Sequence, residues 1–316
     1  MGSSSSDGPP ETGVFASGKA DQLVPKGKPP KIEILGEGSE PRVVLTPKLD
    51  ATGEQKGRVS VGLRMGPQSA LPTIDFDVVT KVDKADDKDK KDGKDSSDKD
   101  KSGKAGSETT FVSTKITGAK LAAKQPGALP KELEAEVAKL KGGVVRCEVV
   151  RSGGILGCTT QLPKGANEGL DGALKALAEA LALRRPPAPD KPLGAGAYWM
   201  VTDRTVVGAV AGIDGLRYRV FKVDSIDKGA IKLSVDVRQY AASDSFEQPG
   251  GPKGASMSIE ALESQGKGAL GVTAGALMPD SGDVNVKLNA RLHVGQGNQR
   301  TMVQLEMSSR IGAGSD

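Results

Sequence analysis

Alternation between apolar and polar residues constrains the fold of this chain more than any other feature. From Val284 to Val294 every second residue is apolar, and polar or charged residues fill the positions between. The same period of two runs through residues 231–238 and 58–64. Clean alternation is typical of antiparallel sheets with one face in water. The sequence therefore predicts an α+β fold that is mainly antiparallel β.

Two stretches have helical periodicity instead. Near 167–185, Asn167 can cap a helix whose apolar face consists of Leu170, Leu174, Leu177 and Leu181. Near 130–141, Pro130 can occupy the first turn, and a pair of glycines ends the segment. Both segments are amphipathic, so we expect both helices to pack on the sheet.

Composition divides the chain into several parts. Residues 1–30 are rich in Ser, Gly, Pro and Lys, which predicts a disordered tether. We expect a first β-rich half over residues 31–185 and a second over 194–312. A Pro-rich linker at 186–193 would separate the halves, and residues 313–316 would form a tail.

The first half contains a strongly charged segment at residues 81–108. It carries nine lysines and nine acidic residues, with Val82 as its one sizeable apolar side chain, so it predicts a disordered insertion between strands. Residues 98–103 match the first six positions of a calcium-binding loop. Position twelve, however, is Thr109 instead of a bidentate Glu, so we interpret the segment as a charged loop and predict no metal.

The order of motifs repeats between the halves. A pair of short motifs occurs in both halves: Lys48-Leu49-Asp50 with Lys56-Gly57 in the first, and Lys222-Val223-Asp224 with Lys228-Gly229 in the second. This repetition is typical of a duplicated β-hairpin. We predict two related β-meander halves that form a curved sheet or half-barrel. The sequence leaves open whether the halves share one sheet or form two.

The two cysteines flank a Ser-Gly-Gly turn at equal distances. Cys147 and Cys158 would therefore face each other on neighbouring strands, close enough to form a disulfide. A disulfide indicates an oxidising, extracytoplasmic compartment. The alternative interpretation is a pair of reduced, half-buried thiols.

A family resemblance follows from the serine-rich start, the helix, the Pro-rich linker and the Gly-rich opening of the second half at residues 194–199. Together these features resemble secreted bacterial lipoproteins of unknown function. The start is similar to the residues after a lipidated cysteine, with Met1 in the place of that cysteine. The pattern of sheet and helices also resembles the lipoprotein-carrier half-barrel, although the duplication and the low aromatic content depart from it. The resemblance implies a periplasmic or outer-membrane location.

Each candidate catalytic motif in the sequence has a simpler structural interpretation. The only histidine, His293, falls on the polar face of a strand, where a solvated side chain is expected. Two of four carboxylates could in principle form a hydrolytic pair, but each alternates with apolar neighbours, as outward-facing strand residues do: Asp75, Asp77, Asp236 and Glu260. The glycine motif at residues 266–271 precedes a strand instead of a helix, so we predict a hairpin turn there and no cofactor. No catalytic residue is predicted.

These observations favour a non-catalytic binding or scaffold protein of the cell envelope. Candidate residues for lining a groove are Tyr198, Trp199, Leu174, Leu177 and Leu181, although core packing is the preferred interpretation for the two aromatic residues. Its partner would be an apolar small molecule, a lipid or an envelope protein. Dispersed charge argues against nucleic acid, a membrane would be reached only through an N-terminal lipid anchor, and we expect a monomer. The alternative function is a carboxylate-dependent envelope hydrolase.

Overall fold

A computed structural model describes most of the chain. The described residues are 9–50, 52–65, 69–70, 72–83, 109–123, 129–207, 212–247, 256–294 and 300–312. Strands account for 56% of the structure and helices for 13%, which confirms the predicted α+β class with mainly antiparallel β-structure. Most of the predicted insertion, residues 84–108, and the predicted tail, residues 313–316, lie outside the described residues.

The elements follow one another in this order along the chain: α1 Lys19–Leu23, β1 Lys31–Gly36, β2 Ser39–Val43, β3 Glu54–Met65, β4 Ser69–Ala70, β5 Ile74–Val82, β6 Thr109–Leu121, α2 Lys131–Ala138, β7 Val144–Val150, β8 Ile155–Gln161, the 3-10 turn Glu168–Leu170, α3 Asp171–Arg184, β9 Leu193–Ala195, β10 Tyr198–Val207, β11 Ile213–Asp227, β12 Ala230–Ala241, β13 Ser245–Glu247, β14 Ser256–Thr273, β15 Ser281–Val294 and β16 Arg300–Gly312. The strands predicted from alternation are confirmed in β3, β12 and β15. The two predicted helices are confirmed as α2 and α3.

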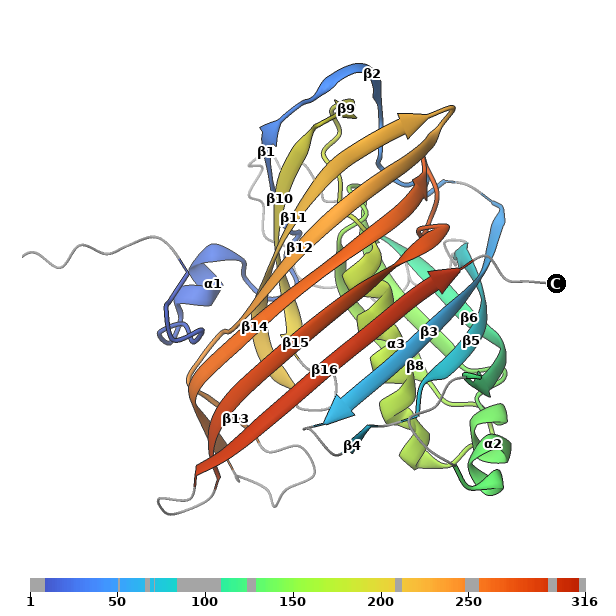
Figure 1. The fold of residues 1–316 in the computed structure, drawn as a ribbon, viewed down its shortest axis with the longest axis vertical. Helices are drawn as coiled ribbons and strands as arrows, with labels where there is room; N and C mark the ends of the chain where they lie inside the picture. The colour runs from blue at the N-terminus through green and yellow to red at the C-terminus, as the bar shows by residue number, and fades with distance from the viewer. Residues whose placement is uncertain are drawn as a thin grey trace, which may run out of the picture.

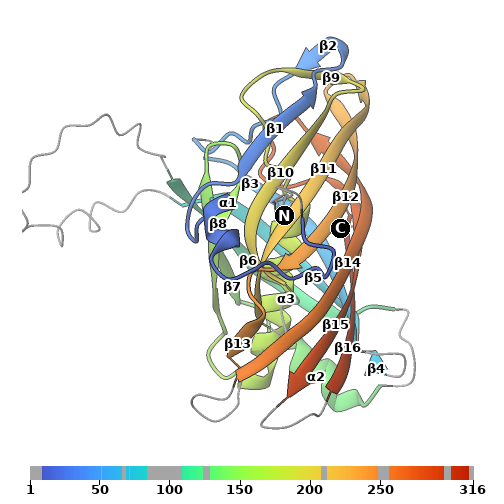
Figure 2. The same cartoon turned by 90° about the vertical axis from the view of Figure 1, so that its left-hand side faces the viewer.

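One 14-stranded sheet contains almost all the strands, in the order β1-β10-β11-β12-β14-β15-β16-β3-β5-β6-β7-β8, with β13 on β14 and β4 on β3. The last strand, β16, pairs antiparallel with β3, with Gly312 opposite Arg58. The two halves therefore share one sheet, a point that the sequence left open. The sheet is curved and does not close into a barrel, and α3 lies against its inner face (Figures 1 and 2).

The predicted boundary between the halves does not separate the strands. Strand β1 pairs with β10, with Lys31 opposite Thr202, and β2 pairs with β9 in a small second sheet. Residues 31–43, which composition placed in the first half, thus belong structurally with the second. Backbone hydrogen bonding is the reason: the outer edge of β10 needs a partner strand, and β1 supplies it.

The prediction of a disordered tether over residues 1–30 is wrong for residues 9–30. Val14 forms a parallel bridge with Ala241, while the amide of Leu262 donates to the carbonyl of Thr12 at 2.9 Å. The segment is thus inserted between β12 and β14. Gly13 has a φ of 74°, and a Cβ there would lie 1.6 Å from the Leu262 oxygen, so glycine is required. Farther along, Phe15, Ala20 and Val24 are buried, which stabilises the segment by apolar burial.

The Pro-rich linker is also packed instead of free. Residues 186–188 are buried, and the amide of Ala188 donates to the carbonyl of Ser152 at 2.9 Å. On the other side, Nε1 of Trp199 donates to the carbonyl of Pro187 at 2.8 Å. The linker therefore connects the β7–β8 turn with β10, and so joins the two ends of the curved sheet.

Residues 266–271 lie within β14 and do not form the hairpin turn that the sequence predicts. A Cβ on Gly268 would lie 2.3 Å from the carbonyl oxygen of Asp283 on β15. Glycine at this position is therefore explained by the close approach of two strand backbones. Among the described residues, no helix is long and apolar enough to cross a membrane.

Candidate functional site

Four arginines are buried where α3 ends against the inner face of the sheet. Arg184 and Arg185 end the helix, and Arg217 and Arg219 come from β11. In β11 the two arginines alternate in step with the inward-facing Phe221, so the strand period carries their side chains into the interior. Buried cations need a compensating charge or hydrogen bonds, which makes this cluster the most unusual part of the core.

Asp203 of β10 compensates part of this charge. Its side chain is 5% exposed, and it accepts from Nε and Nη2 of Arg217 at 3.1 and 2.5 Å. Nη2 of Arg219 donates to the same carboxylate at 3.0 Å. One carboxylate therefore serves two guanidinium groups. Their planar donors fit its two oxygens in a fixed geometry.

Arg219 also caps the end of α3. Its Nη1 atom lies 3.0, 3.1 and 2.9 Å from the carbonyl oxygens of Ala182, Leu183 and Arg185. The last carbonyls of a helix have no partner within the helix and carry partial negative charge, so a cation there is favourable. This contact joins the helix of the first half to a strand of the second.

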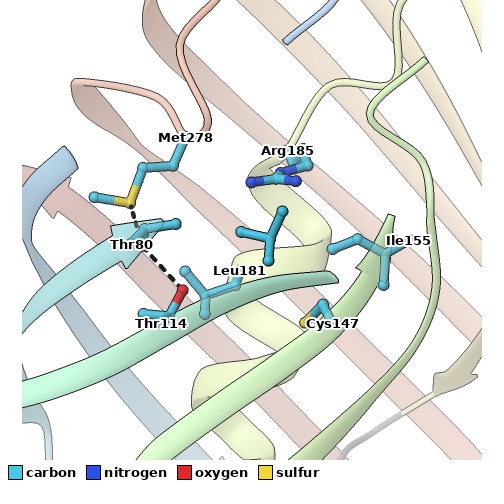
Figure 3. A pocket seen from close by; sticks show the side chains of 8 residues that line it. Thr80, Thr114, Cys147, Ile155, Leu181, Arg185 and Met278 are labelled. Atoms are coloured by element: carbon cyan, nitrogen blue, oxygen red, sulfur yellow. Dashed lines mark hydrogen bonds between the residues drawn. The ribbon is translucent and has the colours of Figure 1, made fainter. Parts of the chain in front are cut away.

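A small cavity with a volume of about 20 Å³ lies beside the cluster. Figure 3 shows the residues that line it: Thr80, Val112, Thr114, Cys147, Ile155, Leu181, Arg185 and Met278. The hydroxyl oxygens of Thr80 and Thr114 lie 2.9 Å apart, and that of Thr80 is 3.5 Å from the Met278 sulfur. The cavity has room for a water molecule and is far smaller than an acyl-chain pocket.

Arg185 is the one cation in the lining of this cavity. Its Nη2 atom donates to the carbonyl of Leu277. Within the part of the chain that the structure describes, its Nη1 atom is buried and has no hydrogen-bond partner. The guanidinium group points toward the space between Met278 and Leu181 (Figure 3). A buried cationic donor thus faces the cavity with unused hydrogen-bonding capacity.

Burial shifts the titration of these groups. Desolvation lowers the pKa of Arg185 to about 10 and that of Arg184 to about 9, with Asp283 opposing the shift of Arg184. For Arg219, desolvation and the neighbouring Arg217 lower the pKa to about 9, and Asp203 opposes them. All three guanidinium groups still carry their charge at pH 7.

The predicted disulfide is confirmed. Cys147 and Cys158 face each other on β7 and β8, and their Cα atoms lie 4.0 Å apart. The alternative of two reduced thiols is therefore set aside. Cys147 is also part of the cavity lining, so the disulfide and the arginine cluster belong to neighbouring parts of the same interior.

The five candidate groove residues do not form a groove together. Trp199 is completely buried and stacks on Phe221 with ring centroids 5.3 Å apart, and Leu174 and Leu177 are buried in the core. Tyr198, the residue before Trp199 on β10, is 42% exposed, so the preferred interpretation of core packing is wrong for Tyr198. Leu181 lines the small cavity. The preferred interpretation of Trp199 as a core residue agrees with its position.

The carboxylates considered for hydrolysis are each engaged elsewhere. Asp77 pairs with Arg58 at 2.7 Å, and Asp75 accepts from the hydroxyl of Ser60 at 2.6 Å. Asp236 lies 3.9 Å from Lys267 on the exposed surface. Glu260 contacts Arg291 at 3.1 Å and His293 at 3.5 Å. Among the described residues, no three His, Cys, Asp or Glu side chains gather as a metal site requires.

Sequence analysis missed Asp203, Arg217 and Arg219. A signal was present: in β10 and β11 these charged residues stand at positions in step with Trp199 and Phe221, which the strand period assigns to the interior. A charged residue on an apolar face needs a partner, so this break in the alternation pointed to a buried ion pair.

No family model and no curated protein sequence matches the chain. The resemblance to secreted bacterial lipoproteins therefore remains a prediction.

Proposed function

We propose that the chain is a non-catalytic scaffold or binding protein of the bacterial cell envelope, and that it binds an envelope protein through the outer face of its sheet. The observation that carries this proposal is the occupied inner face. Helix α3 and residues 186–188 fill the space where a half-barrel carrier would hold an apolar ligand. We therefore assign the partner to the outer face.

The outer face supports this role by its composition. On β12 the exposed charged residues are Lys232, Asp236 and Arg238, and the exposed residues of β15 include Asn285. Mixed charges on a broad, regular surface suit a polar protein partner better than a lipid, because protein interfaces tolerate paired charges at their rims.

The disulfide supports the proposed location. Disulfides such as Cys147–Cys158 form and persist mainly in oxidising compartments, such as the periplasm or the outer surface of the cell. Anchoring by an N-terminal lipid is part of this proposal.

Site-specific photo-crosslinking in the native organism tests the proposal. A photoreactive amino acid would replace Lys232 or Asn285 on the outer face, and Lys175 on the exposed side of α3 serves as the matched control. We expect one defined adduct from both outer-face positions and none from position 175. Adducts of equal yield at all three positions would contradict a specific outer surface.

Two further measurements separate the alternatives. Solvent extraction and mass spectrometry of protein purified from the envelope should release no stoichiometric lipid; a stoichiometric lipid would favour the carrier. Incubation with envelope polysaccharide should release no product. Product release that Asp77→Asn abolishes would favour the carboxylate-dependent hydrolase.

A further inference from the structure

The cavity beside Arg185 combines a buried cation with unused hydrogen-bond donors. We propose that it is a binding site for a small monovalent anion, of which chloride is the expected occupant. The ligand would lie between Nη1 of Arg185 and the hydroxyl groups of Thr80 and Thr114. This inference is independent of the partner on the outer face.

The donor inventory favours an anion over a neutral ligand. Nη1 of Arg185 offers two N–H groups, and no acceptor among the described residues engages them. The hydroxyl oxygens of Thr80 and Thr114 lie 2.9 Å apart, so one hydroxyl donates its proton to the other. The proton of the second hydroxyl remains for the thioether of Met278 or for a ligand in the cavity. Thioether sulfur is a weak acceptor, and an anion would compete with it successfully.

The charge balance of the interior points the same way. Asp203 is shared by Arg217 and Arg219, so it does not serve Arg185, whose partner in the structure is a backbone carbonyl. No carboxylate lines the cavity. In a low-polarity interior an uncompensated cation is costly, and an ion of opposite charge beside it is strongly favoured.

The size of the cavity limits the ligand. The cavity volume of about 20 Å³ is enough for one water molecule or for one monatomic ion of slightly larger radius. Phosphate and sulfate carry four oxygens and a higher charge, and they exceed this space. The remaining lining is apolar or sulfur-containing: Val112, Cys147, Ile155, Leu181 and Met278. Polarizable walls suit chloride or bromide better than strongly hydrated fluoride.

Thermal unfolding of the full-length, disulfide-bonded protein tests the site. The melting temperature would be measured in sodium chloride, in sodium bromide and in sodium gluconate of equal ionic strength, because gluconate is too large for the cavity. We expect chloride and bromide to raise the melting temperature in a saturable way relative to gluconate. Equal melting temperatures in the three salts would overturn the proposal.

Variants locate the effect. Arg185→Met should abolish the difference between chloride and gluconate, and Thr114→Val should raise the apparent chloride dissociation constant by about tenfold, the loss expected for one hydrogen bond to an ion. Arg146→Met is the matched control, because Arg146 is 45% exposed and lies outside the cavity lining; it should keep the full difference. Retention of the difference in Arg185→Met would contradict the site.

Crystallography keeps the proposal testable if Arg185→Met does not fold. Crystals of the wild-type protein soaked in sodium bromide should show an anomalous scatterer within hydrogen-bond distance of Nη1 of Arg185. Density for a water molecule there, with no anomalous signal, would overturn the proposal. The Thr114→Val protein, soaked in the same way, should show reduced bromide occupancy.

Discussion

The two faces of the sheet carry the same kind of ion pair in opposite environments. On the outer face, Lys267 and Asp236 lie 3.9 Å apart with side chains 89% and 67% exposed. On the inner face, Arg217 and Asp203 lie 2.5 Å apart and are 2% and 5% exposed. Water screens the outer pair, so its loss changes little, whereas loss of either partner inside leaves a buried charge without compensation.

The buried ion pairs belong to the contact that joins the two halves of the molecule, and the exposed pair does not. The inner cluster contains the contact between the end of α3 and β11, while the outer pairs join neighbouring strands. We therefore expect the effects of charge removal to follow burial instead of distance in the sequence.

The largest effect is expected from Asp203→Asn. The amide cannot compensate Arg217 and Arg219, so the free energy of unfolding should fall by about 3–5 kcal/mol, as for other broken buried pairs. Urea unfolding followed by circular dichroism measures the change. A loss no greater than that of Asp236→Asn would show that the interior cluster is more solvated than its burial indicates.

The disulfide should rank second. Replacing Cys147 and Cys158 together by Ala removes a link across a sequence separation of 11 residues, which corresponds to about 2–3 kcal/mol of chain entropy in the unfolded state. Urea unfolding of the double variant and of the reduced wild-type protein measures the effect. The two should agree; a wild-type protein that reduction leaves unchanged would contradict the prediction.

A smaller and pH-dependent effect is expected at Asp214, which fastens the N-terminal segment to β11. Burial alone would raise the pKa of Asp214, but hydrogen bonds and charge from Arg204 and Lys26 outweigh it and hold the pKa below its ordinary value of 3.8. A depressed pKa in the folded state contributes stability above the ordinary value, and this contribution is lost as the pH falls through the folded-state pKa.

Asp214→Asn should therefore destabilise the protein at pH 7 by about 1 kcal/mol or less, since solvent screens this half-exposed group. The difference from the wild-type protein should shrink as the pH falls below about 4. Urea unfolding at several pH values measures it. A difference that stays constant down to the lowest pH at which the protein folds would exclude the carboxylate as its source.

The smallest effect is expected from Asp236→Asn on the outer face, at less than about 0.5 kcal/mol. High salt should reduce even this difference, because exposed pairs are screened within about 10 Å at 0.1 M ionic strength. Thermal unfolding in low and high salt provides the measurement. A salt-independent loss would indicate that this pair is part of a more protected network.

Local patterns accounted for much of the fold. Alternation located the long strands, Asn167 was recognised as a cap and accepts from the amide of Gly169 at 2.8 Å, and symmetry about a turn identified the disulfide. Each of these signals depends on residues close together in the sequence. Contacts between distant segments left no comparable signal: the insertion of Val14 beside Ala241 and the pairing of β1 with β10 both cross most of the chain.

The sequence by itself determined the antiparallel β-class, the positions of the two helices and the cysteine pairing, because strand period, helix period and turn symmetry are local properties. The tertiary structure alone decided that the halves share one sheet, that residues 9–30 and 186–188 are packed, and that Arg185 faces a cavity. A polar or Pro-rich segment becomes ordered when strands distant in the sequence form hydrogen bonds with its backbone. Here β12 and β14 bind residues 12–15, and the β7–β8 turn and β10 bind residues 187–188; composition does not reveal these partners.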